Sequence, residues 1–147
     1  MYNFNFYKAK DTKDAVDKLN ASSDGKLLAG GQTLLAAMKL RLSAPSDLVS
    51  LEGIENLANI EISGKDLQVG AMARHTEVAE SKLVQDTIPS LSKLASGIGD
   101  RMVRNMGTIG GSIANNDPAA DYPAAILGLG AKIKTNRREI QADEFFS

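Results

Sequence analysis

The chain has 147 residues, of which 43% are hydrophobic and 24% charged, the composition of an ordinary globular protein. The formal net charge is −1 and basic residues are spread along the chain, which argues against nucleic acid as a partner. The absence of cysteine excludes disulfides and cysteine-ligated iron–sulfur clusters, and a single histidine argues against a metal site built on imidazoles.

The N-terminal residues and the hydropathy of the chain predict where in the cell the protein is located. Residues 1–6 do not have the basic and apolar regions of a signal peptide. No stretch approaches the ~20 apolar residues that a transmembrane helix needs. The sequence therefore predicts a cytoplasmic protein with no membrane span.

The first 53 residues predict a β-α-β subdomain. The expected elements in chain order are a strand over residues 2–6, a helix capped by Asp11 or Thr12, a strand over residues 26–29, a helix over residues 33–42 and a strand over residues 48–51. Tyr2, Phe4 and Phe6 alternate with polar residues, and we expect these aromatic side chains and Tyr7 to pack in the core and at the sheet edge.

Residues 54–147 predict a second, α+β subdomain. Two short apolar runs flank residues 63–66, which is typical of a β-hairpin. Thr76 is expected to cap a short helix, and Pro89 to open a second helix. Residues 100–121, rich in Gly and Asn, are expected to be irregular, and are followed by a helix over residues 122–129 and a strand over residues 131–135.

The first candidate binding segment runs from Leu27 to Leu34. A predicted strand runs into Gly30-Gly31 and then directly into a helix, whose N-terminal N–H groups suit a phosphate. Gln32 and Thr33 add side-chain donors. Taken alone, the pattern also fits a plain strand-to-helix turn, and the G-x-G-x-x-G spacing of nicotinamide enzymes is absent.

The second candidate segment is Gly107-Thr108-Ile109-Gly110-Gly111-Ser112-Ile113. Such a loop can present successive N–H groups in a concavity that holds an anion, although a tight turn between core segments is the alternative. A diphosphate needs donors from two sides, so the presence of both segments in one small chain favours a dinucleotide ligand.

In this order, the motifs Ala29-Gly30-Gly31-Gln32-Thr33-Leu34 and Arg104-Asn105-Met106-Gly107-Thr108-Ile109-Gly110-Gly111-Ser112 resemble the FAD-binding domain of the molybdenum hydroxylases. That family includes the medium subunit of aerobic carbon monoxide dehydrogenase and the FAD domain of xanthine dehydrogenase. Residues 34–42, 118–125 and 142–146 extend the similarity along the chain. The resemblance implies an α+β fold of the vanillyl-alcohol-oxidase/PCMH type, in which two subdomains hold FAD between them.

The resemblance also implies the residues of the site. Those around the pyrophosphate would be Leu28, Ala29, Gly30, Gly31, Gln32, Thr33, Leu34, Thr108, Ile109, Gly110, Gly111 and Ser112. Ile98 would lie against the flavin ring, and Asn115 and Asp121 would contact polar groups of the ligand. Asp121 could equally cap the helix that begins near Pro123.

The function implied by the resemblance is electron relay. Electrons would reach FAD from 2Fe–2S clusters on a small subunit, after leaving a substrate at a molybdopterin cofactor on a large subunit, and would pass to NAD, a quinone or oxygen. No catalytic residue and no metal ligand are assigned to this chain. Two alternatives are a stand-alone flavin reductase of the same architecture and a non-enzymatic, truncated scaffold subunit.

The remaining expectations concern individual residues. His75 is expected to be structural or solvated rather than catalytic, and Met102 and Met106 are expected to fill gaps. Arg101 and Arg104 are expected to contact phosphate, to hydrogen-bond loop carbonyls or to pair with Asp100. Gly30→Val and Gly110→Val are expected to abolish flavin binding without unfolding the chain. Relative to the family, the end at residues 144–147 reads as a C-terminal truncation, which predicts weak FAD binding by this chain alone.

Overall fold

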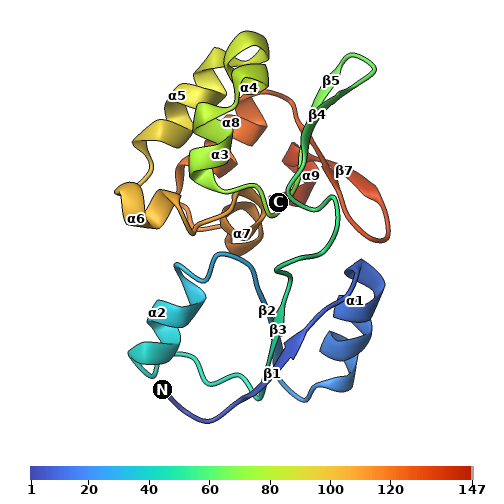
Figure 1. The fold of residues 1–147 in the computed structure, drawn as a ribbon, viewed down its shortest axis with the longest axis vertical. Helices are drawn as coiled ribbons and strands as arrows, with labels where there is room; N and C mark the ends of the chain where they lie inside the picture. Colours follow the sequence, from blue (N-terminus) through green and yellow to red (C-terminus); the bar gives the residue numbers. More distant parts are fainter. Residues whose placement is uncertain (147) are drawn as a thin grey trace.

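The computed structural model describes residues 1–146, which form two parts stacked along the long axis of the molecule (Figure 1). The lower part consists of β1 (Asn5–Lys8), α1 (Thr12–Ala21), β2 (Gly25–Leu28), α2 (Leu34–Lys39) and β3 (Asp47–Ser50). The three strands form a parallel sheet in the order β1-β3-β2, so the last strand in the sequence is central. This is the predicted β-α-β arrangement.

The lower part has its own small core. Ala9, Ala15, Val49 and Ile54 form one buried apolar cluster, and all four residues of β3 are buried. Helix α1 begins at Thr12 because the Asp11 carboxylate accepts the N–H of Asp14 at 2.7 Å.

The predicted core packing was wrong for three of the four N-terminal aromatic residues, whereas Phe4 is half-buried. Tyr2, Phe6 and Tyr7 are 51%, 55% and 40% exposed, respectively. The strand begins at Asn5 rather than at Tyr2 and lies at the edge of the sheet, where one side has no neighbouring strand. Alternation of aromatic and polar residues therefore indicated the strand but not its burial.

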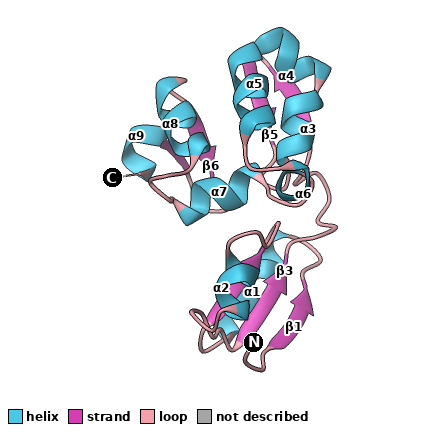
Figure 2. Cartoon of the chain, turned by 90° about the vertical axis from the view of Figure 1, so that its left-hand side faces the viewer, coloured by secondary structure: helices cyan, strands magenta, loops and turns pink. Residues whose placement is uncertain are grey.

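The upper part consists of two antiparallel hairpins and seven helices in the described residues. Its elements are β4 (Ile60–Ser63), β5 (Asp66–Val69), α3 (His75–Glu80), α4 (Lys82–Thr87), α5 (Pro89–Gly97), α6 (Arg101–Arg104), α7 (Ile109–Asn115), α8 (Asp121–Gly128), β6 (Lys132–Lys134), β7 (Glu139–Gln141) and α9 (Ala142–Phe145). Figure 2 shows α7 on the side of this part that faces the parallel sheet. The core of the upper part includes Val78, Val84, Leu91, Ile109 and Tyr122.

Local capping explains where the first helices of the upper part begin. Helix α3 begins two residues earlier than a Thr76 cap would place it, because Arg74 is the N-cap residue and its N–H donates to the carboxylate of Glu77 at 2.7 Å. Helix α4 was not predicted, and its N-terminus is capped by the hydroxyl of Ser81. Pro89 occupies the first turn of α5, as predicted.

The prediction of an irregular segment over residues 100–121 was wrong, since α6 and α7 lie within it. The Asp100 carboxylate accepts the N–H of Val103 at the start of α6, and the Thr108 hydroxyl caps α7 in the same way. Met102 and Met106, predicted to fill gaps in the core, are 75% and 49% exposed on this segment. No helix within residues 1–146 combines the length and the apolar character needed to cross a membrane.

Candidate functional site

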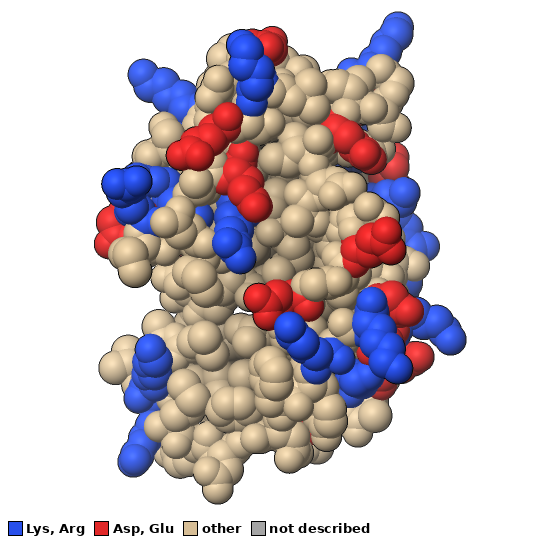
Figure 3. All heavy atoms as spheres, in the orientation of Figure 1, with Lys and Arg blue, Asp and Glu red and all other residues tan. Residues whose placement is uncertain are grey.

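A cleft of about 780 Å³ lies between the two parts, within the usual size range of small-molecule sites. It is lined from below by residues 26–34, which join β2 to α2, and from above by residues of α7 and the turns around it. Figure 3 shows the surface notched between the two parts on the side of α2 and α6. On that face acidic and basic side chains are interspersed, without an extended patch of one sign.

The lower wall of the cleft carries backbone N–H groups that are not hydrogen-bonded within the part of the protein that the structure describes. The N–H groups of the five residues from Gly30 to Leu34 have no hydrogen-bond acceptor among residues 1–146. The first N–H that is satisfied belongs to Leu35, which donates to the carbonyl of Gly31 at 3.0 Å. Gly31 has a φ of +73°, which favours glycine and turns the chain sharply between β2 and α2. Five consecutive unpaired donors beside a cleft suit an anionic ligand.

The upper wall differs from the expectation of free N–H groups. Residues 109–112 form the first turn of α7, and their N–H groups are bonded within the protein. Ile109 and Gly110 donate to the carbonyls of Ala73 and Ala71 at 3.0 and 2.9 Å, and Gly111 donates to the hydroxyl of Thr108 at 3.1 Å. Side-chain donors on this wall are the hydroxyls of Thr108 and Ser112, the amide of Asn115 and the imidazole of His75.

Two of the glycines allow close packing between segments of the protein, a role that the sequence interpretation did not assign to them. A β-carbon on Gly30 would stand 2.1 Å from the carbonyl oxygen of Met106, and one on Gly110 would stand 2.5 Å from the β-carbon of Ala71. Both glycines therefore allow close backbone approach between segments. Gly30→Val and Gly110→Val would therefore disturb the fold around the cleft as well as the binding of a ligand.

Most of the residues predicted for the site line the cleft. The predicted residues that do so are Leu28, Ala29, Gly30, Gly31, Gln32, Thr33, Leu34, Ile98, Thr108, Gly110, Gly111, Ser112 and Asn115. Ile109 does not, because its side chain points into the core and is 4% exposed. Asp121 does not either, and it makes no side-chain cap at the start of α8, whose N-cap residue is Ala120. Contact between these residues and FAD remains a prediction.

Arginine 104 supports the turn that carries Ile98. Its guanidinium donates from Nη1 to the carbonyls of Ile98 and Gly99 at 3.1 and 2.9 Å. Of the three roles considered for Arg104, the structure shows the contact with loop carbonyls. Ile98, half-buried at the end of α5, is thereby held at the edge of the cleft.

Several lining residues were not predicted. They include Lys26, Leu51, Ala71, Met72, His75 and Val103. Lys26 and Asp117 are the only lysine, arginine, aspartate or glutamate residues lining the cleft in the described chain, so attraction of a diphosphate would rest mainly on the backbone N–H groups. His75 is 5% exposed, and burial lowers the pKa of its imidazole. Its ring contacts that of Tyr122, which lies 47 residues later in the sequence. A contact between such distant residues cannot be predicted from local sequence patterns, so the place of His75 in the cleft was missed.

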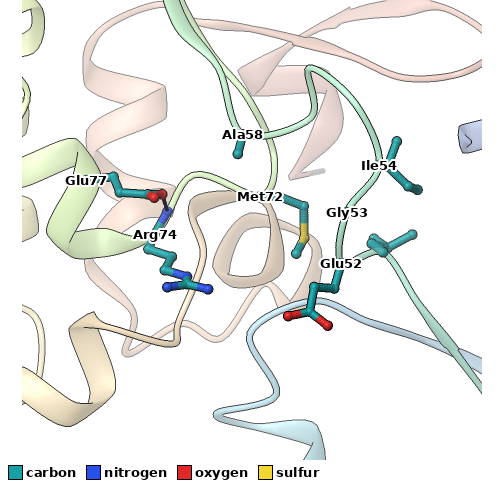
Figure 4. Close-up of a pocket in the computed structure, with 8 residues that line it drawn as sticks. Glu52, Gly53, Ile54, Ala58, Met72, Arg74 and Glu77 are labelled. Atoms are coloured by element: carbon teal, nitrogen blue, oxygen red, sulfur yellow. Dashed lines mark hydrogen bonds between the residues drawn. The ribbon is translucent and has the colours of Figure 1, made fainter. Parts of the chain in front are cut away.

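A second, smaller hollow of about 280 Å³ shares Leu51 and Met72 with the cleft (Figure 4). Its charged lining residues are Glu52, Arg74 and Glu77. Glu52 is paired with Lys8 at 3.3 Å and Glu77 accepts from the backbone of Arg74. The hollow is smaller than the usual dinucleotide-sized site. Among residues 1–146, no group of three His, Asp or Glu side chains is placed to hold a metal ion.

Comparison with known proteins agrees with this geometry. Residues 2–147 match the family model of the FAD-binding domain in molybdopterin dehydrogenases. The chain is 38% identical to the carbon monoxide dehydrogenase medium chain of Hydrogenophaga pseudoflava, over 97% of this chain and 52% of that protein. It is 32% identical to the glyceraldehyde dehydrogenase medium chain of Sulfolobus acidocaldarius, again over 97% and 52%. The chain thus spans about half the length of these curated relatives.

Solved structures give the same result. The carbon monoxide dehydrogenase of Hydrogenophaga pseudoflava superposes with a TM-score of 0.94 at 38% identity, over 99% of this chain and 52% of that one. The quinoline 2-oxidoreductase of Pseudomonas putida 86 gives 0.90 at 33% identity, over 95% and 50%. These matches confirm the predicted α+β fold of this FAD-binding type. The chain belongs to the family of FAD-binding domains of molybdopterin dehydrogenases.

Proposed function

We propose that residues 1–53 and 54–147 are two subdomains that bind FAD in the cleft between them, as part of a flavin subunit of a molybdenum hydroxylase. The observation that carries this proposal is the row of five unpaired backbone N–H groups from Gly30 to Leu34 at the cleft wall. Gly30, Gly31 and Leu34 are half-buried, and Gln32 and Thr33 are exposed. Consecutive unpaired donors beside a cleft support a ligand rich in acceptor oxygens.

The ligand in this proposal is a dinucleotide, because donors face the cleft from both sides. The lower wall offers backbone N–H groups, and the upper wall offers Thr108, Ser112 and Asn115. A pyrophosphate has enough oxygens to accept from both walls at once. Small lining residues such as Ala29 and Gly111 place little side-chain bulk between a ligand and the backbone.

The chain's own residues would bind and orient the cofactor. FAD, when bound, supplies redox chemistry that joins one-electron and two-electron carriers. Ile98 and Met72 offer apolar surface on which a flat ring can pack away from water. No side chain of the cleft is proposed as a general acid or base, so the protein's share is positioning and the exclusion of water.

The partners proposed are an iron–sulfur small subunit and a molybdopterin large subunit. The curated relatives include proteins named as medium chains or medium subunits of carbon monoxide, glyceraldehyde and nicotine-oxidising enzymes. The 147 residues contain no cysteine, so electrons that come from a cysteine-ligated cluster must come from another chain or segment. We propose a cytoplasmic location for this assembly from the sequence alone.

Titration of the flavin-free protein with FAD and with FMN tests the ligand. FMN has one phosphate and cannot occupy both walls through a pyrophosphate, so we expect FAD to bind at least about tenfold more tightly, a difference of about 1.4 kcal/mol. Equal affinity for the two flavins would contradict the proposed role of the cleft.

A second experiment separates the electron relay from its alternatives. Flavin reduction is followed by visible absorption after a candidate substrate or NADH is added, with and without purified iron–sulfur and molybdopterin subunits. The relay predicts substrate-dependent reduction only in the assembled complex. Rapid reduction of the chain by itself would favour a stand-alone reductase, and failure to bind any flavin would favour a scaffold role.

A further inference from the structure

The histidine at the start of α3 lies at the floor of the cleft. The imidazole of His75 is 5% exposed and is one of the residues that line the cleft. Its backbone N–H donates to the carbonyl of Gly107 at 3.0 Å. A β-carbon on Gly107 would stand 2.5 Å from Nε2 of the ring, so the Nε2 edge is packed against the glycine that also lines the cleft.

The other ring nitrogen of His75 faces the protein interior. Nδ1 is fully buried and has no hydrogen-bond partner among the described residues. The hydroxyl of Tyr122, on α8, is likewise fully buried without a partner. These are the two buried side-chain polar atoms without a partner in residues 1–146, and they belong to rings in contact, with centroids 5.3 Å apart and planes tilted by 46°.

The chemistry of the two atoms is complementary. A tyrosine hydroxyl is a donor, and a neutral imidazole has one nitrogen that accepts while the other carries the proton. The two atoms do not hydrogen-bond to each other directly, and buried polar groups are rarely left unpaired, so two such groups on neighbouring rings point to a bridge through one buried water. Burial lowers the pKa of His75 and raises that of Tyr122, with the adjacent Asp121 adding to the latter, so both side chains are neutral near pH 7.

We propose that the Tyr122 hydroxyl donates to one buried water, which in turn donates to Nδ1 of His75 and so fixes the imidazole proton on Nε2, and that Nε2–H is a donor to the dinucleotide in the cleft. His75 is then a ligand-contact residue and Tyr122 a positioning residue that acts through it. The second half of this inference rests on the proposed function, whereas the first half concerns the protein without ligand.

The tautomer can be measured directly because His75 is the only histidine in the 147 residues. Long-range ¹H–¹⁵N correlation spectra of the ¹⁵N-labelled, flavin-free chain distinguish a protonated from an unprotonated ring nitrogen. We expect the proton on Nε2 in the parent protein, and a mixture of both tautomers in Tyr122→Phe. Tyr7→Phe, which removes a hydroxyl from a residue of β1 that does not line the cleft, should leave the imidazole signals unchanged. A proton on Nδ1 in the parent protein would overturn the proposal without any ligand present.

Binding of FAD tests the contact with the ligand. His75→Gln keeps an N–H donor close to the position of Nε2, and we expect its FAD affinity to stay within about threefold of the parent value. His75→Leu keeps the bulk without the donor, and we expect about a tenfold loss, which is the size of one hydrogen bond. Circular dichroism and thermal melts show whether each variant is folded.

The outcomes separate this inference from the proposed function. If the parent protein binds FAD tightly and His75→Leu, folded, binds it equally well, the contact is wrong and the proposed function stands. If FAD leaves the Nε2–H signal of the parent protein unmoved at saturation, the contact is also wrong. If the parent protein binds no FAD, the proposed function fails, and the tautomer measurement still decides whether the Tyr122–His75 pair exists.

Discussion

The α-carbon of Gly30 lies against the carbonyl oxygen of Met106, so closely that a β-carbon on Gly30 would stand 2.1 Å from that oxygen. This contact joins the two glycine-rich segments of the sequence, one in each part of the molecule. The bare N–H groups of residues 30–34 are thereby held opposite the first turn of α7. The cleft depends on a glycine whose role is to let two backbones meet.

This contact predicts an effect of Gly30→Ala on folding as well as on binding. A single methyl group has no space there, so the two segments must move apart, and we expect a lower melting temperature and weaker FAD binding. Gly97→Ala is the matched control, because a β-carbon at the end of α5 meets no atom within 4 Å. Thermal melts that place the two variants at the same stability would contradict the packing role of Gly30.

The cap of α7 predicts a stability difference between two substitutions of Thr108. Thr108→Ala removes the hydroxyl that accepts the N–H of Gly111, and we expect a loss of about 1 kcal/mol in the free energy of unfolding. Thr108→Ser keeps that oxygen and should recover most of the loss. Urea unfolding measures both variants, and an alanine variant as stable as the serine variant would show that the cap contributes nothing.

The lowered pKa of His75 predicts a dependence of stability on pH. The ordinary pKa is 6.5, and burial lowers it in the folded state, so the unfolded chain binds the proton more readily. The contribution of the neutral His75 to the stability of the folded protein is therefore complete above pH 6.5, and it is lost as the pH falls through the lowered folded-state pKa. Between about pH 7.5 and about pH 5.5, the free energy of unfolding should fall more for the parent protein than for His75→Gln.

The aspartates with shifted pKa values change their protonation below the range from about pH 7.5 to about pH 5.5, so they do not contribute to the pH dependence expected from His75. Hydrogen bonds from Ser46 and Asn5 lower the pKa of Asp47, and a hydrogen bond from Lys18 lowers that of Asp14. Both start from 3.8, so the stability they contribute is present above that pH and is lost as pH falls below it. Parallel pH profiles for the parent protein and His75→Gln would contradict the assignment of the higher transition to His75.

The positions of Asn115, at the end of α7, and Asp121, at the start of α8, predict unequal effects on binding. Asn115 lines the cleft, whereas Asp121 is exposed and does not. We expect Asn115→Ala to weaken FAD binding by about threefold to tenfold, the effect of one hydrogen bond, and Asp121→Ala to weaken it less. Flavin fluorescence titration measures both affinities. A greater loss with Asp121→Ala would mean that the ligand contacts the start of α8, outside the residues that line the cleft.

Sequence patterns were sufficient where the local signal and the tertiary structure agree. The run from β2 through Gly30-Gly31 into α2 was predicted because strand, turn and helix signals follow one another without conflict. Helix α7 was missed because Gly110 and Gly111 have low helix propensity, and the turn is held instead by Thr108 and by the distant carbonyls of Ala71 and Ala73. Hydrogen bonds between residues so far apart in the sequence cannot be predicted from the pattern of neighbouring residues.

The most direct test of the central claim is backbone amide hydrogen exchange in the presence and absence of FAD. We predict that the amides from Gly30 to Leu34 exchange rapidly in the free protein and become protected when FAD binds, because they have no acceptor within residues 1–146. The amides of Ile109 and Gly110, bonded to Ala73 and Ala71, should already be protected without ligand. Unchanged exchange at residues 30–34 in the FAD-saturated protein would contradict the claim that these five N–H groups bind the dinucleotide.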